Sequence, residues 1–387
     1  MRILLITDGI YPFVMGGMQK YAYYLGKFLS KAGVKVHLVH CAQDLAPGAE
    51  MARAEFQGFD GRYITFESLP FPAASKVPGH YISDNKLYSN AVLELVRDKL
   101  ADFDLVYCQG FTAWAFIEAK EQGNLDIPVV SNLHGYEMYQ RPPSLKGWLG
   151  QWLLRSATKR ITLGSDAVVS YGGHINSILF GMGVPPENVV ECPLGVEASW
   201  LVSAPSPTSD THREFVFIGR DERRKGVHEL TLALKALLKK SKADIKFHFI
   251  GPILEGHRLI DDRIIYHGAV HEEEKIKRIL RGADVLVCPS YSEGMPTVIM
   301  EGMSSGLAII ATDVGAVNRQ VHGNGWLLPA PDVNAIRHAL EKAIELPTEQ
   351  LDALKRVSLE RVRDNFTWED VISRKLKLLE EIAHRGN

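Results

Sequence analysis

The feature that most constrains this chain is a regular alternation of strand-like and helix-like segments. Arg2–Thr7 and Val34–His40 are short and mostly apolar, and Gly17–Ala32 between them carries Tyr, Phe and Leu side chains at helical spacing. Such alternation predicts βαβ units, in which parallel strands form a sheet with helices on both faces. We therefore predict an α/β fold.

The alternation restarts in the second half of the 387-residue chain, which is too long for one typical domain. Residues 199–212 are rich in Pro, Ser and Thr and predict a linker. We predict one Rossmann-like domain over residues 1–198 and a second over residues 213–366. With 46% apolar and 23% charged residues, the chain can bury ordinary globular cores.

Charge and cysteine usage narrow the function further. The net charge of −2 gives no basic field, so we expect no nucleic-acid partner. The four cysteines are far apart in the sequence and indicate buried free thiols in a reducing compartment. The first apolar run is too short for a secretory signal, and no apolar stretch reaches the ~18 residues of a transmembrane helix. We therefore expect a cytoplasmic protein.

The stretch Pro289–Gly306 combines a loop and a helix directly after a buried strand. Glu293 lies in the loop and Glu301 in the helix, at the sheet edge where open α/β folds bind ligands. The first-turn amides of Thr297 and Val298 have no partner within the helix. Two carboxylates beside such amides suit a polyhydroxylated ligand. Two solvated glutamates without a ligand are the alternative.

A basic loop, Gly219–Gly226, follows the first strand of the second half and opens a helix. The planar guanidinium group of Arg220 and the ammonium group of Lys225 are suited to bind a diphosphate at such a helix start. We expect Lys225 to be exposed and dispensable for folding. The alternative is a solvated basic helix start.

Other positions carry weaker signals. Gly16 and Gly17 follow the first strand and let a ligand approach the backbone, but the pattern GxGxxG is absent, which argues against a nicotinamide or flavin cofactor. Asp102 and Asp104 form a DxD pattern at the wrong end of a strand for a metal–nucleotide site. We predict no catalytic metal and no cofactor.

Residues 146–163 predict a helix that mixes Trp and Leu with Lys and Arg. Such a helix can lie on an anionic membrane or pack in the core with a solvated basic back. We favour the core, because this helix precedes the strand Ala167–Ser170 as an ordinary βαβ helix does. A peripheral contact of the first domain with the inner face of a membrane stays open.

Several motifs together resemble the retaining glycosyltransferases of family 4. They are the phrase Pro-Ser-x-x-Glu-Gly-x-Pro before Glu301, the Gly-Arg…Lys-Gly spacing of the basic loop, His134-Gly, and Pro193–Glu197, in which Leu194 replaces the family's usual Asn. The resemblance implies the GT-B fold, with two Rossmann-like domains whose parallel sheets face each other across a cleft. It also implies that the C-terminal helix, residues 367–387, packs back on the first domain.

The resemblance assigns roles to residues. Glu293 would face the donor sugar and Glu301 the ribose, while Arg220 and Lys225 would neutralise the departing diphosphate. His134 would face the 6-position of the sugar. The implied catalytic residues are His134, Arg220, Lys225 and Glu293. The implied nucleotide-sugar contacts are Gly16, Gly17, Gly219, Arg220, Lys225, Gly251, Gly294, Met295, Pro296, Thr297, Val298 and Glu301.

The activity implied is metal-independent, retaining transfer of a sugar from a nucleoside diphosphate sugar, expected to be UDP-linked. The acceptor would be a hydroxyl of a glycan, a lipid-linked glycan or a small molecule, in polysaccharide or glycoconjugate biosynthesis. Two alternatives are another GT-B enzyme, such as a nucleotide-sugar epimerase, and a catalytically silent nucleotide-sugar-binding protein.

Overall fold

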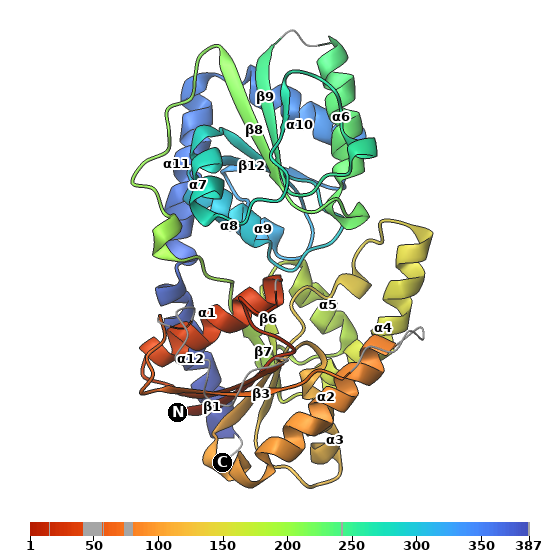
Figure 1. Cartoon of the computed structure of the whole chain (residues 1–387), viewed down its shortest axis with the longest axis vertical. Helices are drawn as coiled ribbons and strands as arrows, with labels where there is room; N and C mark the ends of the chain where they lie inside the picture. Colours follow the sequence, from red (N-terminus) through yellow and green to blue (C-terminus); the bar gives the residue numbers. More distant parts are fainter. Residues whose placement is uncertain (15, 42–55, 57, 73–79, 241–242, 386–387) are drawn as a thin grey trace. The chain divides into compact units, whose positions relative to one another are not determined.

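The computed structural model describes the 387-residue chain except residues 15, 42–55, 57, 73–79, 241–242 and 386–387 (Figure 1). The chain divides into two compact units. Unit 1 comprises Met1–Tyr139, Leu149–Leu194 and Glu369–Asn387; unit 2 comprises Gln140–Trp148 and Gly195–Trp368. Each unit has its own parallel sheet covered by helices, which confirms the α/β prediction with two Rossmann-like domains.

In the described part of unit 1, seven parallel strands are arranged in the order β3-β2-β1-β4-β5-β6-β7. The strands are β1 Arg2–Ile6, β2 Lys35–Cys41, β3 Ile64–Leu69, β4 Leu105–Gln109, β5 Val129–Asn132, β6 Ala167–Ser170 and β7 Val189–Glu191. The helices that lie wholly or mostly in this unit are α1 Gly17–Lys31, α2 His80–Val96, α3 Trp114–Glu121, α4 Leu145–Gly164, α5 His174–Met182 and α12 Trp368–Arg385. The first four residues of α4 and the first residue of α12 belong to unit 2.

The core of unit 1 explains why its strands are almost wholly apolar. Parallel strands covered by helices on both faces lose contact with water on both sides. Ile3, Leu4, Leu5 and Ile6 of β1 accordingly have no exposed surface. One continuous cluster joins α2, α3, α4 and α5 to the face of the sheet that carries Leu4 and Ile6.

In the described part of unit 2, six parallel strands follow the order β10-β9-β8-β11-β12-β13. They are β8 His212–Ile218, β9 Asp244–Ile250, β10 Ile264–Tyr266, β11 Val285–Cys288, β12 Ala308–Thr312 and β13 Gly325–Leu328. The helices are α6 Val227–Lys240, α7 Glu273–Gly282, α8 Thr297–Ser304, α9 Val317–Gln320, α10 Val333–Glu345 and α11 Thr348–Asn365. Helices α6 and α10 pack together over one face (Figure 1).

Both sheets contain a point where the strand order reverses. In unit 1 it lies between β1 and β4, and in unit 2 between β8 and β11. Loops that leave the carboxyl ends of two such strands diverge and form the crevice where open α/β sheets bind ligands. The loops after β8 and β11 are the two motif-bearing loops of the second half.

Helix α4 differs from the expected core helix. Ala157 and Ile161 pack into the unit 1 core, but Trp148, Leu149 and Trp152 are about half exposed. The prediction that its Trp and Leu side chains belong to the core is therefore wrong for these three residues.

Within the described ranges, no helix has the length and apolar character needed to span a bilayer. All four cysteines are free and buried, as expected.

Candidate active site

The loops after β8 and β11 interlock at the strand-order reversal of unit 2. The two strands are neighbours, with Phe215 opposite Val285. Gly226 ends the first loop with a left-handed backbone, φ 70°, and a Cβ placed there would lie 2.0 Å from the carbonyl oxygen of Pro289. Only glycine combines this φ with such a close approach at little steric cost. The contact brings the basic loop against the glutamate loop.

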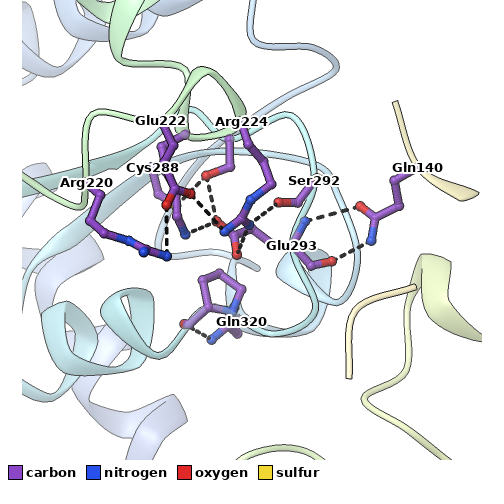
Figure 2. Close-up of polar contacts among 11 residues, drawn as sticks. Gln140, Arg220, Glu222, Arg224, Cys288, Ser292, Glu293 and Gln320 are labelled. Carbon is purple, nitrogen blue, oxygen red and sulfur yellow. Dashed lines mark hydrogen bonds and ion pairs between the residues drawn. The ribbon is translucent and has the colours of Figure 1, made fainter. Parts of the chain in front are cut away.

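Glu293 is the centre of the resulting charge cluster (Figure 2). Its Oε1 accepts hydrogen bonds from Lys225 Nζ at 2.6 Å and from Ser290 Oγ at 2.7 Å. Its Oε2 lies 3.5 Å from Arg224 Nη1. The side chain of Glu293 is only 8% exposed and that of Lys225 only 19%. The expectation that Lys225 is exposed is therefore wrong, because it pairs with a buried carboxylate.

The electrostatics of this cluster keep Glu293 ionised. Burial by itself would raise the pKa of this carboxyl, but the charges of Lys225 and Arg224 and the hydrogen bonds from Lys225 and Ser290 lower it below its usual value. Opposite charges within hydrogen-bonding distance favour the charged form. Glu293 is thus a fixed, buried anion rather than a proton donor.

The structure distributes the arginines differently from the sequence expectation. Arg220 has a 72% exposed side chain and pairs with Glu222 at 2.8 Å rather than with Glu293. Arg224, to which the sequence analysis assigned no role, contacts Glu293 and also donates to the carbonyl oxygen of Ser292 at 3.1 Å. Its position directly before Lys225 in the basic loop was the sequence feature that could have identified Arg224 as a site residue. Ser290, three residues before Glu293, was also missed.

Helix α8 begins directly after the glutamate loop. Pro296 precedes it, and no side chain caps its N-terminus, so the amides of Thr297 and Val298 point out of the first turn. Two hydrogen bonds from the segment after β12 stabilise the glutamate loop. Ala316 N donates to Gly294 O at 2.7 Å, and Gln320 Nε2 donates to Pro296 O at 3.0 Å (Figure 2). Met295, in the same loop, is buried.

Three further predicted residues of unit 2 fall around the same sheet edge. Glu301 lies on α8 and is partly buried. Gly251 follows β9, and a Cβ on it would meet the carbonyl oxygen of Gly219 at 1.9 Å, so the chain ends of β8 and β9 touch there. Gly251 N donates to Gly268 O at 2.8 Å, which fixes this turn.

His134 belongs to a buried polar cluster of unit 1. It follows β5 with a left-handed backbone, φ 60°. Its Nδ1 lies 2.7 Å from Tyr171 Oη and its Nε2 3.2 Å from Gln109 Oε1. Lys375 of α12 is fully buried near this cluster, 5.9 Å from the centre of the Tyr21 ring. Among the described residues its Nζ has no hydrogen-bond partner. No sequence pattern indicated that the charge of Lys375 acts on His134.

Burial, reinforced by the Lys375 charge, lowers the pKa of His134 from 6.5 to about 3. The imidazole is therefore neutral at physiological pH. A neutral imidazole has one N–H donor and one acceptor, which suits hydrogen bonding to a hydroxyl rather than stabilisation of an anion.

This depressed pKa makes stability depend on pH. Between about pH 6.5 and pH 3 the unfolded chain protonates His134 and the folded chain does not, so the stabilisation is complete above pH 6.5 and declines as the pH falls. At pH 5, about 1.5 pH units below 6.5, the loss is about 2 kcal/mol. Urea unfolding should show wild type losing that much more than His134→Gln between pH 7 and pH 5. Parallel losses in the two proteins would contradict a His134 that stays neutral in the folded chain.

Two further predicted positions, Gly16 and Gly17, belong to unit 1. Gly16 directly precedes α1, and Gly17 has open space around it. Asp104 accepts the backbone N–H of Arg2 at 2.7 Å, and Asp102 lies 3.8 Å from the Arg2 guanidinium. Both aspartates therefore contact Arg2, the first residue of β1. Within the described ranges, no group of three or more His, Cys, Asp or Glu side chains is arranged to hold a metal ion.

Two models of glycosyltransferase families match the two halves of the chain. The model of Glycosyltransferase Family 4 matches residues 15–200, and the model of glycosyl transferases group 1 matches residues 212–345. Over 347 residues the chain is 25% identical to a Bacillus subtilis protein provisionally named a teichuronic acid biosynthesis glycosyltransferase, covering 86% of each chain.

Two solved structures show the same fold at lower identity. Sucrose-phosphate synthase from Thermosynechococcus elongatus matches with a TM-score of 0.77 at 18% identity over 99% of both chains. HepE from Anabaena, in complex with UDP and glucose, matches with a TM-score of 0.67 at 17% identity over 98% of this chain and 99% of that one. Both halves match glycosyltransferase models, and each half carries a Rossmann-like sheet. The chain therefore belongs to the family 4 glycosyltransferases of the GT-B fold.

Proposed function

We propose that this glycosyltransferase moves a sugar from a UDP-sugar to a hydroxyl of a glycan, glycolipid or small-molecule acceptor, with retention of configuration and without a catalytic metal. The observation that carries the proposal is the contact between the basic loop and Glu293 at the strand-order reversal of unit 2. It places a cationic loop, an anionic side chain and an uncapped helix start at one sheet edge. The complex of HepE with UDP and glucose supports the choice of UDP.

In the proposed mechanism, the cations of the basic loop stabilise charge on the leaving diphosphate. Arg220 is the more exposed of the two predicted cations and can reach a ligand directly, while Lys225 is held by Glu293. Preorganised charges aimed at a developing anion can be the largest catalytic contribution. The Thr297 and Val298 amides add donors for phosphate or sugar oxygens.

Glu293 orients the sugar in this proposal and Glu301 binds the ribose. A carboxylate that is buried and paired with two cations is a weak nucleophile, so Glu293 is better suited to hold sugar hydroxyls than to form a covalent intermediate. Attack on the same face as the leaving phosphate then retains configuration. The similarity to the Bacillus subtilis protein favours polysaccharide or glycoconjugate synthesis as the setting.

Donor binding and hydrolysis test this proposal. UDP-glucose, UDP-galactose and UDP-N-acetylglucosamine, with GDP-mannose and ADP-glucose as controls, are screened by thermal shift. We expect a UDP-sugar to give the largest stabilisation and to release UDP slowly in water. NMR of the freshly released sugar should show the α-anomer first. Stabilisation without any release would favour a silent binding protein, and an isomerised UDP-sugar would favour an epimerase.

The same assay after exhaustive EDTA treatment tests metal independence. The proposal assigns charge neutralisation to Arg220 and Lys225, so we expect UDP release to stay within about twofold of the untreated rate. Loss of release, restored by Mg²⁺ or Mn²⁺, would show that a metal ion takes part.

A further inference from the structure

We propose that the exposed stripe of α4 is a binding surface for an anionic lipid bilayer. The stripe consists of Leu145, Trp148, Leu149, Trp152, Leu153 and Leu163, with Lys146, Lys159 and Arg160 among and beside them. The proposal does not depend on glycosyl transfer, because it concerns one helix face and is tested without donor or acceptor.

The apolar members of the stripe are unusual for a folded surface. Leu145 is 88% exposed, Trp152 55% and Leu149 54%. Among the described residues, thirteen large hydrophobic side chains are exposed, and six of them belong to this helix, including both exposed tryptophans. Exposed apolar residues scattered singly need no explanation, but a contiguous patch marks an interaction site.

Helical geometry gathers these residues on one side. At 100° per residue, positions 145, 149, 152 and 163 lie within an arc of about 60°, and positions 148 and 153 lie on either side of it, about 140° apart. Ala157, Thr158, Ile161 and Thr162 occupy the opposite side and are buried. Helix α4 thus has two apolar faces, one packed in unit 1 and the other exposed to solvent.

The charges of α4 identify the kind of partner. The helix contains Lys146, Arg155, Lys159 and Arg160 and no acidic residue, although the whole chain has a net charge of −2. Arg155 donates to Met138 O, and Arg160 pairs with Glu121 at 2.6 Å. Lys146 and Lys159 are exposed, and no acidic group of the described residues lies within ion-pair distance of them. Their charges are therefore available to an anionic surface.

Tryptophan, leucine and lysine on one face are the combination that a bilayer interface binds. Indole rings prefer the headgroup region, leucines enter the acyl boundary, and lysines attract anionic headgroups. A second copy of the chain is a poorer occupant, because two such faces would bring like charges together. The mixture of apolar and basic side chains favours the bilayer.

Vesicle flotation of the purified chain tests the proposal. We expect binding to vesicles of phosphatidylcholine with about one third phosphatidylglycerol, and at least ~10-fold weaker binding to phosphatidylcholine alone. Added salt should weaken the anionic binding by screening. Leu149→Gln/Trp152→Gln should reduce binding ~10-fold or more, and Lys146→Glu/Lys159→Glu should abolish the preference for anionic vesicles.

Leu87→Gln provides a matched control. Leu87 lies on α2 of the same unit and is 57% exposed, close to the 54% of Leu149, but it lies outside the stripe. Its replacement should leave flotation unchanged. Thermal unfolding of every variant should match wild type, since the replaced side chains are exposed.

Two outcomes would overturn the proposal. Wild-type chain that does not float with anionic vesicles has no such surface. A protein that is dimeric in light scattering, and becomes monomeric in Leu149→Gln/Trp152→Gln, uses the stripe for self-association instead. A failure of donor hydrolysis in the earlier assay would leave the flotation result unaffected, so the two proposals fail separately.

Discussion

Replacing Lys225 with methionine is expected to slow donor hydrolysis and sugar transfer by about 10²- to 10³-fold. This is the effect of removing one preorganised donor from a developing anion, about 3–4 kcal/mol. Because Lys225 Nζ also neutralises Glu293 at 2.6 Å, the same change should destabilise unit 2 by about 3 kcal/mol. The loss of Tm and the loss of turnover are measured together.

A second variant separates these two effects. In Lys225→Met/Glu293→Gln the buried carboxylate is gone together with its partner, so stability should largely recover, while turnover should stay well below that of Glu293→Gln alone. Lys235→Met, at an exposed position on α6, is the matched lysine control and should leave both unchanged. A double variant that turns over as fast as Glu293→Gln alone would show that Lys225 supports the fold and not the reaction.

The two glutamates should separate nucleotide binding from turnover. Under the proposed roles, Glu301→Ala removes a carboxylate that accepts from two ribose hydroxyls, each bond worth roughly 1.5–3 kcal/mol. We expect the Kd for free UDP to rise about 10²-fold and donor binding to weaken in parallel, because these bonds are similar in ground and transition states. Calorimetric titration of UDP measures the change.

Glu293→Gln is the comparison in that titration. It removes the anion that pairs with Lys225 and Arg224 and leaves both cations available to the diphosphate. UDP affinity should therefore stay within about threefold of wild type or improve, while turnover falls because the sugar is no longer held. Equal losses of UDP affinity in the two variants would contradict the assignment of separate roles.

The sequence located both loops of unit 2 but not their contact. Gly219–Gly226 and the segment around Glu293 could each be placed at the carboxyl end of a strand, because an apolar run stops directly before each. The ion pair between Lys225 and Glu293 spans 68 positions and exists because β8 and β11 are neighbours in the sheet. Strand order is a long-range property that local periodicity does not contain. The exposure of Lys225 was accordingly predicted wrongly.

Helix α4 and His134 show two other limits of sequence reasoning. In the first, apolar and basic side chains alternate around the helix, so periodicity could not tell which face is buried, and the core interpretation failed for Trp148 and Trp152. For His134, the local phrase suggested a ligand position, but its low pKa arises from burial and, to a smaller extent, from the charge of Lys375 in the C-terminal helix. Neither influence is encoded near residue 134.

The interlock at Gly226 bears on how enzymes of this kind can be recombined. With a Cβ at Gly226 only 2.0 Å from Pro289 O, neither loop can change its backbone path without displacing the other. A chimera that imports the basic loop of one transferase and the glutamate loop of another would join surfaces that never co-adapted. Residues 219–226 and 289–296 therefore form one cassette, and exchanging donor specificity by domain grafting would require moving them together.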